Sequence, residues 1–154
     1  SGGMLRRFGI AVALVGAPRV LIVDEPTAGL DPAERNRFHR VLADVADDAV
    51  VLLSTHIVED VQNLCGRLAI LNRGAVVAAG TPSELAAALT GKLWSRVVPR
   101  GEPLPDALHV AAAPKGTLVV VQADTQPSEA FSPRIPHLED AYHHALQSAQ
   151  PEAA

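Results

Sequence analysis

The sequence has one cysteine, few aromatic residues and no long hydrophobic run. The lone cysteine, Cys65, excludes a disulfide framework within the chain and fits a reducing compartment. Phe, Trp and Tyr make up 3% of the 154 residues, so we expect a core of Val, Leu, Ile and Ala. The apolar stretch 8–17 is shorter than the roughly 20 residues that span a bilayer, and it lacks a signal-peptide cleavage pattern. We therefore expect a chain that is soluble or at most peripheral to a membrane.

Positive charge is scarce as well. Lys and Arg number 13 against 17 Asp and Glu, which gives a net charge of -4. This balance argues against a protein whose main partner is nucleic acid. Hydrophobic residues make up 48% and charged residues 19%, which is too apolar for a disordered chain. The length fits one domain of ordinary size.

Apolar periodicity predicts alternating helices and strands in the first part of the chain. Two short apolar runs are expected to form buried, parallel strands, and two further runs flank Asn72–Gly74 and predict a hairpin. The expected helices cover residues 4–15, 32–46, 57–65 and 81–89, and the expected strands cover residues 20–23, 49–53, 68–71 and 75–79.

The composition changes after Thr90, and seven prolines interrupt the sequence between residues 99 and 136. We expect strands at 93–98 and 117–121 and a last helix at 137–147. The predicted organisation is therefore a main part, residues 1–89, and a C-terminal accessory extension, residues 90–154. We expect three histidines of this extension to be exposed and to have no metal role, namely His109, His143 and His144.

Polar side chains directly follow both predicted parallel strands. Asp24 and Glu25 come after the first strand, and His56 comes after the second. Ligands of open α/β sheets bind at the carboxyl ends of the strands, so these side chains are expected to meet one ligand. Two adjacent carboxylates suit Mg²⁺-dependent phosphate chemistry, in which one holds the metal's water shell and the other orients an attacking water.

The opening residues, Ser1–Gly3, precede the first predicted helix and offer backbone N–H groups that favour an anion. Each feature also has a simpler interpretation. Asp24–Pro26 alone is compatible with an acidic turn, His56 with a structural histidine, and Ser1–Gly3 with a linker. The combination favours a phosphate site, because all three features would then face one polyanion.

Taken together, these motifs resemble the second half of an ABC transporter ATP-binding cassette. The resemblance covers residues 1–89 and implies an α/β fold with a P-loop NTPase-type parallel sheet flanked by helices, followed by a small α+β extension. The motifs stand in the family's order: the end of the signature motif at 1–4, the Walker B strand with its glutamate at 20–26, the D-loop at 28–32, the switch-histidine segment at 54–56, and the closing hairpin and helix at 71–74 and 79–85.

The resemblance implies a role for each residue that follows a strand. Asp24 would hold Mg²⁺, largely through water. Glu25 would be the general base that polarises the attacking water, and His56 would contact the γ-phosphate of ATP. The implied cofactors are ATP and Mg²⁺, and the implied reaction is ATP hydrolysis.

Four further residues are implied to act in a cassette dimer. Asp31 would help to couple the two halves, and Ser1, Gly2 and Gly3 would contact the γ-phosphate of ATP bound to the opposite subunit. An anion held between two subunits ties closure of the dimer to ATP, and hydrolysis lets the dimer open.

The sequence contains no phosphate-binding loop of the form G-x-x-x-x-G-K-[S/T]. It also lacks the glutamine loop and the aromatic residue that stacks on adenine, and Val12 stands where many cassettes have Arg or Gln. Because the family places the missing motifs before the signature, we expect a C-terminal fragment of a cassette that is inactive alone. Some Val and Leu residues should then pack against strands that this chain does not contain.

The segments 91–94 and 136–142 resemble the extension of ABC-2 type exporters. This implies an ATPase subunit that is peripheral to the cytoplasmic face of the cell membrane and powers export through a separate permease. One alternative is a soluble ABC-type ATPase that acts on ribosomes or DNA, which the acidic balance disfavours. Another is a non-enzymatic chain that only dimerises, which the presence of Glu25 and His56 disfavours.

Overall fold

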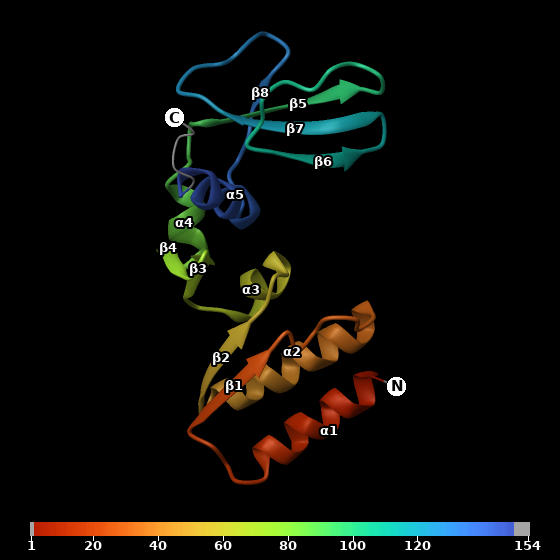
Figure 1. Cartoon of the computed structure of the whole chain (residues 1–154), viewed down its shortest axis with the longest axis vertical. Coiled ribbons are helices and arrows are strands. Elements are labelled where there is room, and N and C mark those ends of the chain that lie inside the picture. The colour runs from red at the N-terminus through yellow and green to blue at the C-terminus, as the bar shows by residue number, and fades with distance from the viewer. Residues whose placement is uncertain (1, 150–154) are drawn as a thin grey trace. The chain divides into compact units, whose positions relative to one another are not determined.

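The computed structural model describes residues 2–149 and contains two compact units (Figure 1). Unit 1 is Ser1–Cys65 and unit 2 is Gly66–Ala154. The sequence-based division after residue 89 follows the cassette motifs instead of the packing, and it stays a prediction. No helix among the described residues has both the length and the apolar character needed to cross a membrane.

Unit 1 is an α/β unit in which helices alternate with two parallel strands, as the apolar periodicity predicts (Figure 1). The strand register pairs Val20 with Val50 and Asp24 with Ser54. The elements are α1 (Gly2–Leu14), β1 (Val20–Asp24), α2 (Pro32–Ala46), β2 (Val50–Ser54) and α3 (Val58–Leu64).

The core of unit 1 lies on one face of this two-stranded sheet. Leu21 and Val23 of β1 are buried there together with Phe38 and Leu42 of α2. The start of α2 is fixed by Asp31, whose Oδ1 accepts a hydrogen bond from the backbone N–H of Glu34 at 2.8 Å. The predicted N-cap of this helix is therefore confirmed.

The opposite face of the sheet is uncovered, so the prediction that these strands are buried is wrong for half of their side chains. Side chains alternate between the two faces of a strand, and only one face meets the described helices of unit 1. The exposed fractions on the other face are 57% for Val20, 71% for Ile22, 67% for Val50 and 60% for Leu52.

Unit 2 begins with the predicted hairpin and helix. The strands β3 (Leu68–Asn72) and β4 (Ala75–Gly80) pair antiparallel. Arg73 and Gly74 connect them with φ values of 50° and 81°, as a two-residue hairpin turn requires. The helix α4 (Pro82–Ala87) follows and begins with the predicted capping box.

The rest of unit 2 is an antiparallel sheet with the order β6-β7-β5-β8, together with helix α5 (Figure 1). Apolar side chains from the strands, α4 and α5 form the core, among them Leu89, Leu93, Leu108, Val120 and Ala141. The remaining elements are β5 (Leu93–Pro99), β6 (His109–Ala113), β7 (Gly116–Gln122), β8 (Ser132–Pro133) and α5 (Leu138–Ser148).

The strand β6 was not predicted from the sequence, and its presence overturns the expectation for His109. This histidine pairs with Val120 of β7, and only 8% of its surface is exposed. His143 and His144 on α5 are half-buried instead of exposed. The pairing of β6 with β7 places His109 inside the unit, which apolar periodicity alone did not indicate.

Candidate functional site

The parallel pairing of β1 and β2 places the residues that follow both strands at one edge of the sheet. The hydroxyl of Ser54, at the end of β2, donates a hydrogen bond to Oδ1 of Asp24, at the end of β1. The backbone N–H of Glu25 donates to the carbonyl of Ser54 at 2.9 Å, so the pairing extends one residue beyond the strand. The predicted meeting of these strand ends is confirmed.

Glu25 and His56 form a hydrogen-bonded pair at this edge. Nδ1 of His56 lies 2.7 Å from Oε1 of Glu25, and the backbone N–H of His56 donates to the same oxygen at 3.1 Å. Since a carboxylate only accepts, Nδ1 carries the proton of this hydrogen bond. Glu25 also has a φ of 44°, a conformation that non-glycine residues rarely adopt and that is enriched at functional sites.

The two carboxylates differ in exposure, which gives them different chemical capacities. Asp24 is exposed and suits the hydrated shell of a cation, while the side chain of Glu25 is 32% exposed. Oε2 of Glu25 is buried and has no hydrogen-bond partner among the described residues. A free acceptor of this kind fits a residue that takes a proton from a water molecule.

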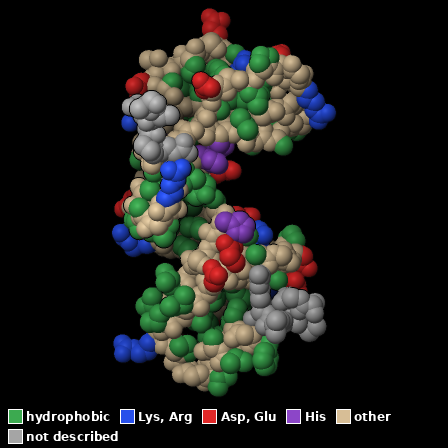
Figure 2. All heavy atoms as spheres, in the orientation of Figure 1, with side chains coloured by type: hydrophobic (Ala, Val, Ile, Leu, Met, Phe, Trp, Pro, Cys, Tyr) green, Lys and Arg blue, Asp and Glu red, His purple; other side chains and the backbone are tan. Residues whose placement is uncertain are grey.

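The histidine beside these carboxylates is largely open to solvent. The side chain of His56 is 73% exposed, so its ring is accessible to a ligand. Figure 2 shows histidine and acidic side chains next to each other on the drawn face of unit 1. The residues present therefore fit a phosphate ligand with a divalent cation.

The remaining predicted site residues do not join this cluster in the described structure. Asp31 begins α2, and its Oδ1 accepts the backbone N–H of Glu34. Gly2 and Gly3 form the first turn of α1. Ser1 lies outside the described residues. No hydrogen bond or ion pair joins Asp31 to the Glu25–His56 pair within residues 2–149.

Sequence reasoning missed a buried polar network behind the site. The hydroxyl of Thr27 donates to Oδ2 of Asp60, and Nε2 of His39 lies 2.9 Å from Oδ1 of Asp60. The exposed fractions of Thr27 and Asp60 are both 0%. The network joins the segment after Glu25 to α2 and α3. A signal existed, because Asp60 lies between Ile57 and Leu64 on the apolar stripe of α3.

Comparisons with known proteins agree with this geometry. A family model described as "AAA domain, putative AbiEii toxin, Type IV TA system" matches residues 1–59. The Nod factor export ATP-binding protein I of Rhizobium meliloti (strain 1021) is 35% identical over 160 residues, which cover 92% of this chain and 47% of that protein. The protein of the same name from Paraburkholderia xenovorans (strain LB400) is 46% identical over 92 residues, which cover 59% of this chain and 30% of that protein. The chain thus spans less than half the length of these curated relatives.

Solved structures show the same relationship. One, described as the ATP-binding subunit of an ABC transporter, matches with 34% identity and a TM-score of 0.52 over 57% of this chain and 37% of that chain. Another, cbiO1 from Clostridium perfringens, matches with 35% identity and a TM-score of 0.51 over 56% of this chain and 36% of that chain. The fold is of the P-loop NTPase type. By sequence and by structure, the chain is related to the ATP-binding proteins of ABC transporters.

Proposed function

We propose that this chain is the catalytic C-terminal part of an ATP-hydrolysing subunit that powers export through a separate membrane permease. The observation that supports it most is the pair formed by Glu25 and His56, whose Oε1 and Nδ1 atoms lie 2.7 Å apart at the ends of parallel strands. The names of the relatives, which are export ATP-binding proteins, support the transport role. The subunit would act on the cytoplasmic face of the cell membrane.

Glu25 would be the general base. One of its oxygens is held by two hydrogen bonds from His56, while the other is buried and free to accept a proton from the attacking water. A base held in this way needs no reorganisation when the proton moves, which favours the transition state. Glu25 has a left-handed backbone with a φ of 44°, and its side chain is hydrogen-bonded to His56.

His56 would bind the terminal phosphate. Its Nδ1 already donates to Glu25, so a second donation to a phosphate oxygen requires a proton on Nε2 as well. The imidazole would then be positively charged, which places a cation between the carboxylate and the phosphate. The same ring would link the base to the bond that is being broken.

Asp24 would hold Mg²⁺ through water molecules, and Ser54 orients its carboxylate by donating to Oδ1. Bound Mg²⁺ supplies positive charge that neutralises phosphate oxygens. This sequence contains no phosphate-binding loop, so the loop that holds the phosphates of ATP would come from another segment. We further propose that Asp31 couples two cassettes, and that Ser1, Gly2 and Gly3 contact ATP held by the second one.

The test is the substitution Glu25→Gln in the full-length protein, purified from membranes. The amide is nearly isosteric but cannot take the proton, so we expect ATP turnover to fall by about 10²-fold or more. ATP-driven dimerisation and association with the permease should be retained, because both depend on binding. Turnover is measured by phosphate release, and dimerisation by light scattering with and without ATP.

The control variant is Glu102→Gln, which removes an exposed carboxylate from a turn of unit 2 and should leave turnover unchanged. A near-normal rate in Glu25→Gln would contradict the assignment of the base. A wild-type protein that hydrolyses ATP but never purifies with a membrane protein would contradict the transport role alone.

A further inference from the structure

Three side chains of unit 2 bring potential metal ligands together, far along the sequence from the candidate ATP site. His109 comes from β6, and Glu139 and His143 come from α5. Each offers one ligand atom, and these atoms all lie within 4.8 Å of one another. Glu139 and His143 are four residues apart and therefore lie on the same face of the helix.

His109 has one nitrogen in use and one without a partner. Its side chain is 4% exposed, and Nε2 lies 2.7 Å from Oδ1 of Asp140. Nδ1 is buried and has no hydrogen-bond partner among the described residues. Buried polar atoms are nearly always paired, so an unpaired nitrogen beside two other potential ligands favours a bound ligand at this place.

Asp140 fixes which nitrogen of His109 is available. The buried Asp140 carboxylate is hydrogen-bonded to Nε2 of His109, to the backbone N–H of His137 and to the Arg134 guanidinium. Nε2 of His109 is therefore in use, and Nδ1 is the nitrogen left without a partner among the described residues. A carboxylate behind a histidine in this way is the usual support of a metal ligand.

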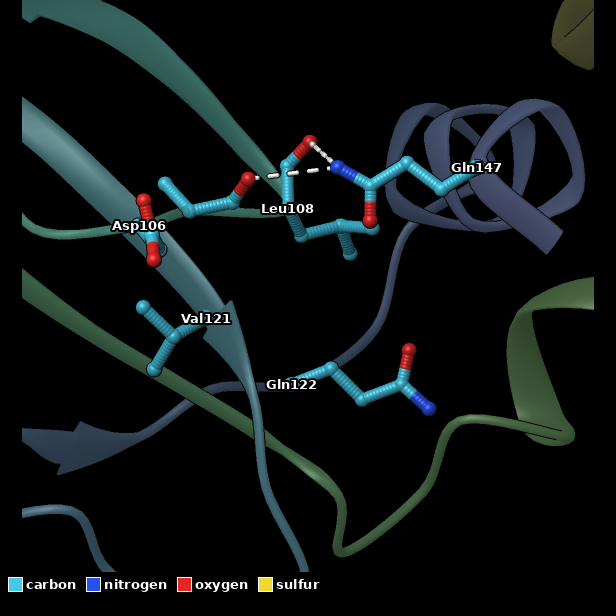
Figure 3. A pocket seen from close by; sticks show the side chains of 6 residues that line it. Asp106, Leu108, Val121, Gln122 and Gln147 are labelled. Atoms are coloured by element: carbon cyan, nitrogen blue, oxygen red, sulfur yellow. Dashed lines mark hydrogen bonds between the residues drawn. The ribbon is translucent and has the colours of Figure 1, made fainter. Parts of the chain in front are cut away.

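The helix that carries the other two ligands is held against the sheet. The side chain of Gln147, near the end of α5, donates to the carbonyls of Ala107 and Leu108 just before β6 (Figure 3). His144 and Gln122 are hydrogen-bonded at 2.8 Å and connect α5 to β7. These contacts hold the C-terminal part of α5, which follows His143, against β7 and the start of β6.

The rings of His109 and His143 are stacked, with their centroids 4.7 Å apart and an interplanar angle of 17°. An imidazole binds a metal in its own plane, so the ring of His143 has to turn out of the stack on binding. Burial lowers the pKa of His143, and the neighbouring His109 lowers it further.

We propose that His109, through Nδ1, together with His143 and Glu139, binds one divalent transition-metal ion. Two imidazoles and one carboxylate match the ligand preferences of Zn²⁺. The proposal does not depend on ATP hydrolysis, since none of these residues belongs to the candidate ATP site.

The test is calorimetric titration of the full chain with ZnCl₂ at neutral pH. The wild-type chain should bind one equivalent, and Zn²⁺ should raise its melting temperature, because the ion binds the folded form. Loss of an outer-sphere partner alone costs about 10–100-fold in metal affinity, so His143→Ala should weaken binding at least as much. Glu139→Gln changes an exposed residue, keeps the fold and should also weaken binding by about tenfold or more.

Two control variants distinguish this site from adventitious binding. Glu129→Gln removes an exposed carboxylate of unit 2 that lies outside the cluster, and it should retain wild-type affinity. Cys65→Ser removes the single thiol and should also retain the wild-type affinity for Zn²⁺. No saturable Zn²⁺ binding by the wild-type chain would overturn the proposal. Unchanged affinity in both His143→Ala and Glu139→Gln would overturn it equally.

Discussion

At the scale of single residues, two carboxylate–histidine pairs with opposite surroundings carry the chemistry of the chain. The ring of His56 is 73% exposed beside Glu25, whereas His109 and Asp140 are 4% and 0% exposed. An exposed pair can exchange a proton with a ligand that comes and goes. A buried pair instead holds one tautomer and one ring orientation, because no water competes for its hydrogen bond.

We predict that the free energy of unfolding depends on pH through the imidazole of His143. Burial lowers the pKa of this imidazole below its ordinary value of 6.5, so the unfolded chain binds the proton more tightly than the folded chain. The stabilising contribution is therefore present above about pH 6.5 and is lost as the pH falls through the lowered folded value. We expect the free energy of unfolding to decrease between about pH 7.5 and 5.5, and His143→Gln to reduce this slope. Urea unfolding of the wild-type chain and of His143→Gln at both pH values measures the change in the free energy of unfolding. An equal change in the two proteins would contradict the prediction.

Single residues could be predicted where a sequence rule fixes their place. Asp24, Glu25 and His56 follow apolar runs, and the ends of parallel strands meet, so their proximity followed from the sequence. His109 could not be placed, because its burial depends on an unpredicted strand. Asp60 was missed, although its position on an apolar helix stripe was visible.

At the scale of elements, side-chain caps mark the starts of α2 and α4. Thr81 accepts the backbone N–H of Glu84 at 3.1 Å, and the Glu84 carboxylate accepts the backbone N–H of Thr81 at 2.8 Å. These two hydrogen bonds hold the first turn of α4, a helix of only six residues. This capping box could be predicted from the sequence, because both of its hydrogen bonds join residues that are three positions apart.

We expect Thr81→Ala to lower the free energy of unfolding of the full chain by about 1 kcal/mol, since the N–H of Glu84 loses its partner. The measurement is the urea midpoint followed by circular dichroism. Thr90→Ala is the matched control, because Thr90 is exposed and lies beyond the end of α4. A loss of the same size in both variants would show that the cap contributes nothing.

Strands that depend on long-range pairing were harder to predict. Residues 109–113 are rich in alanine and carry little strand propensity, yet they pair with β7 across Pro114 and Lys115. The two-residue turn between two apolar runs was the available signal. The strand β8 has only two residues, opposite Trp94 and Ser95, and no periodicity can be read from so short a segment.

At the scale of the whole chain, the two units differ in how completely their sheets are covered. In unit 2, Val98, Val119 and Val120 are 0% exposed within a four-stranded sheet. In unit 1, Ile22 and its neighbours leave one face of a two-stranded sheet open to solvent. This exposed apolar face is consistent with the expectation that some Val and Leu residues pack against strands outside this chain. That expectation stays a prediction.

Hydrogen exchange should separate the two units. Amides open more often where few apolar contacts hold a strand, so we expect those of β1 and β2 to exchange faster than those of β5 and β7 in the 154-residue chain. In the full-length protein, additional strands that cover Val20 and Ile22 should slow exchange in β1 and β2 alone. The central strands β5 and β7 are the internal control, because their side chains are already covered. Equal exchange in both units of the chain, or no slowing of β1 and β2 in the longer protein, would mean that the open face of unit 1 needs no covering strands.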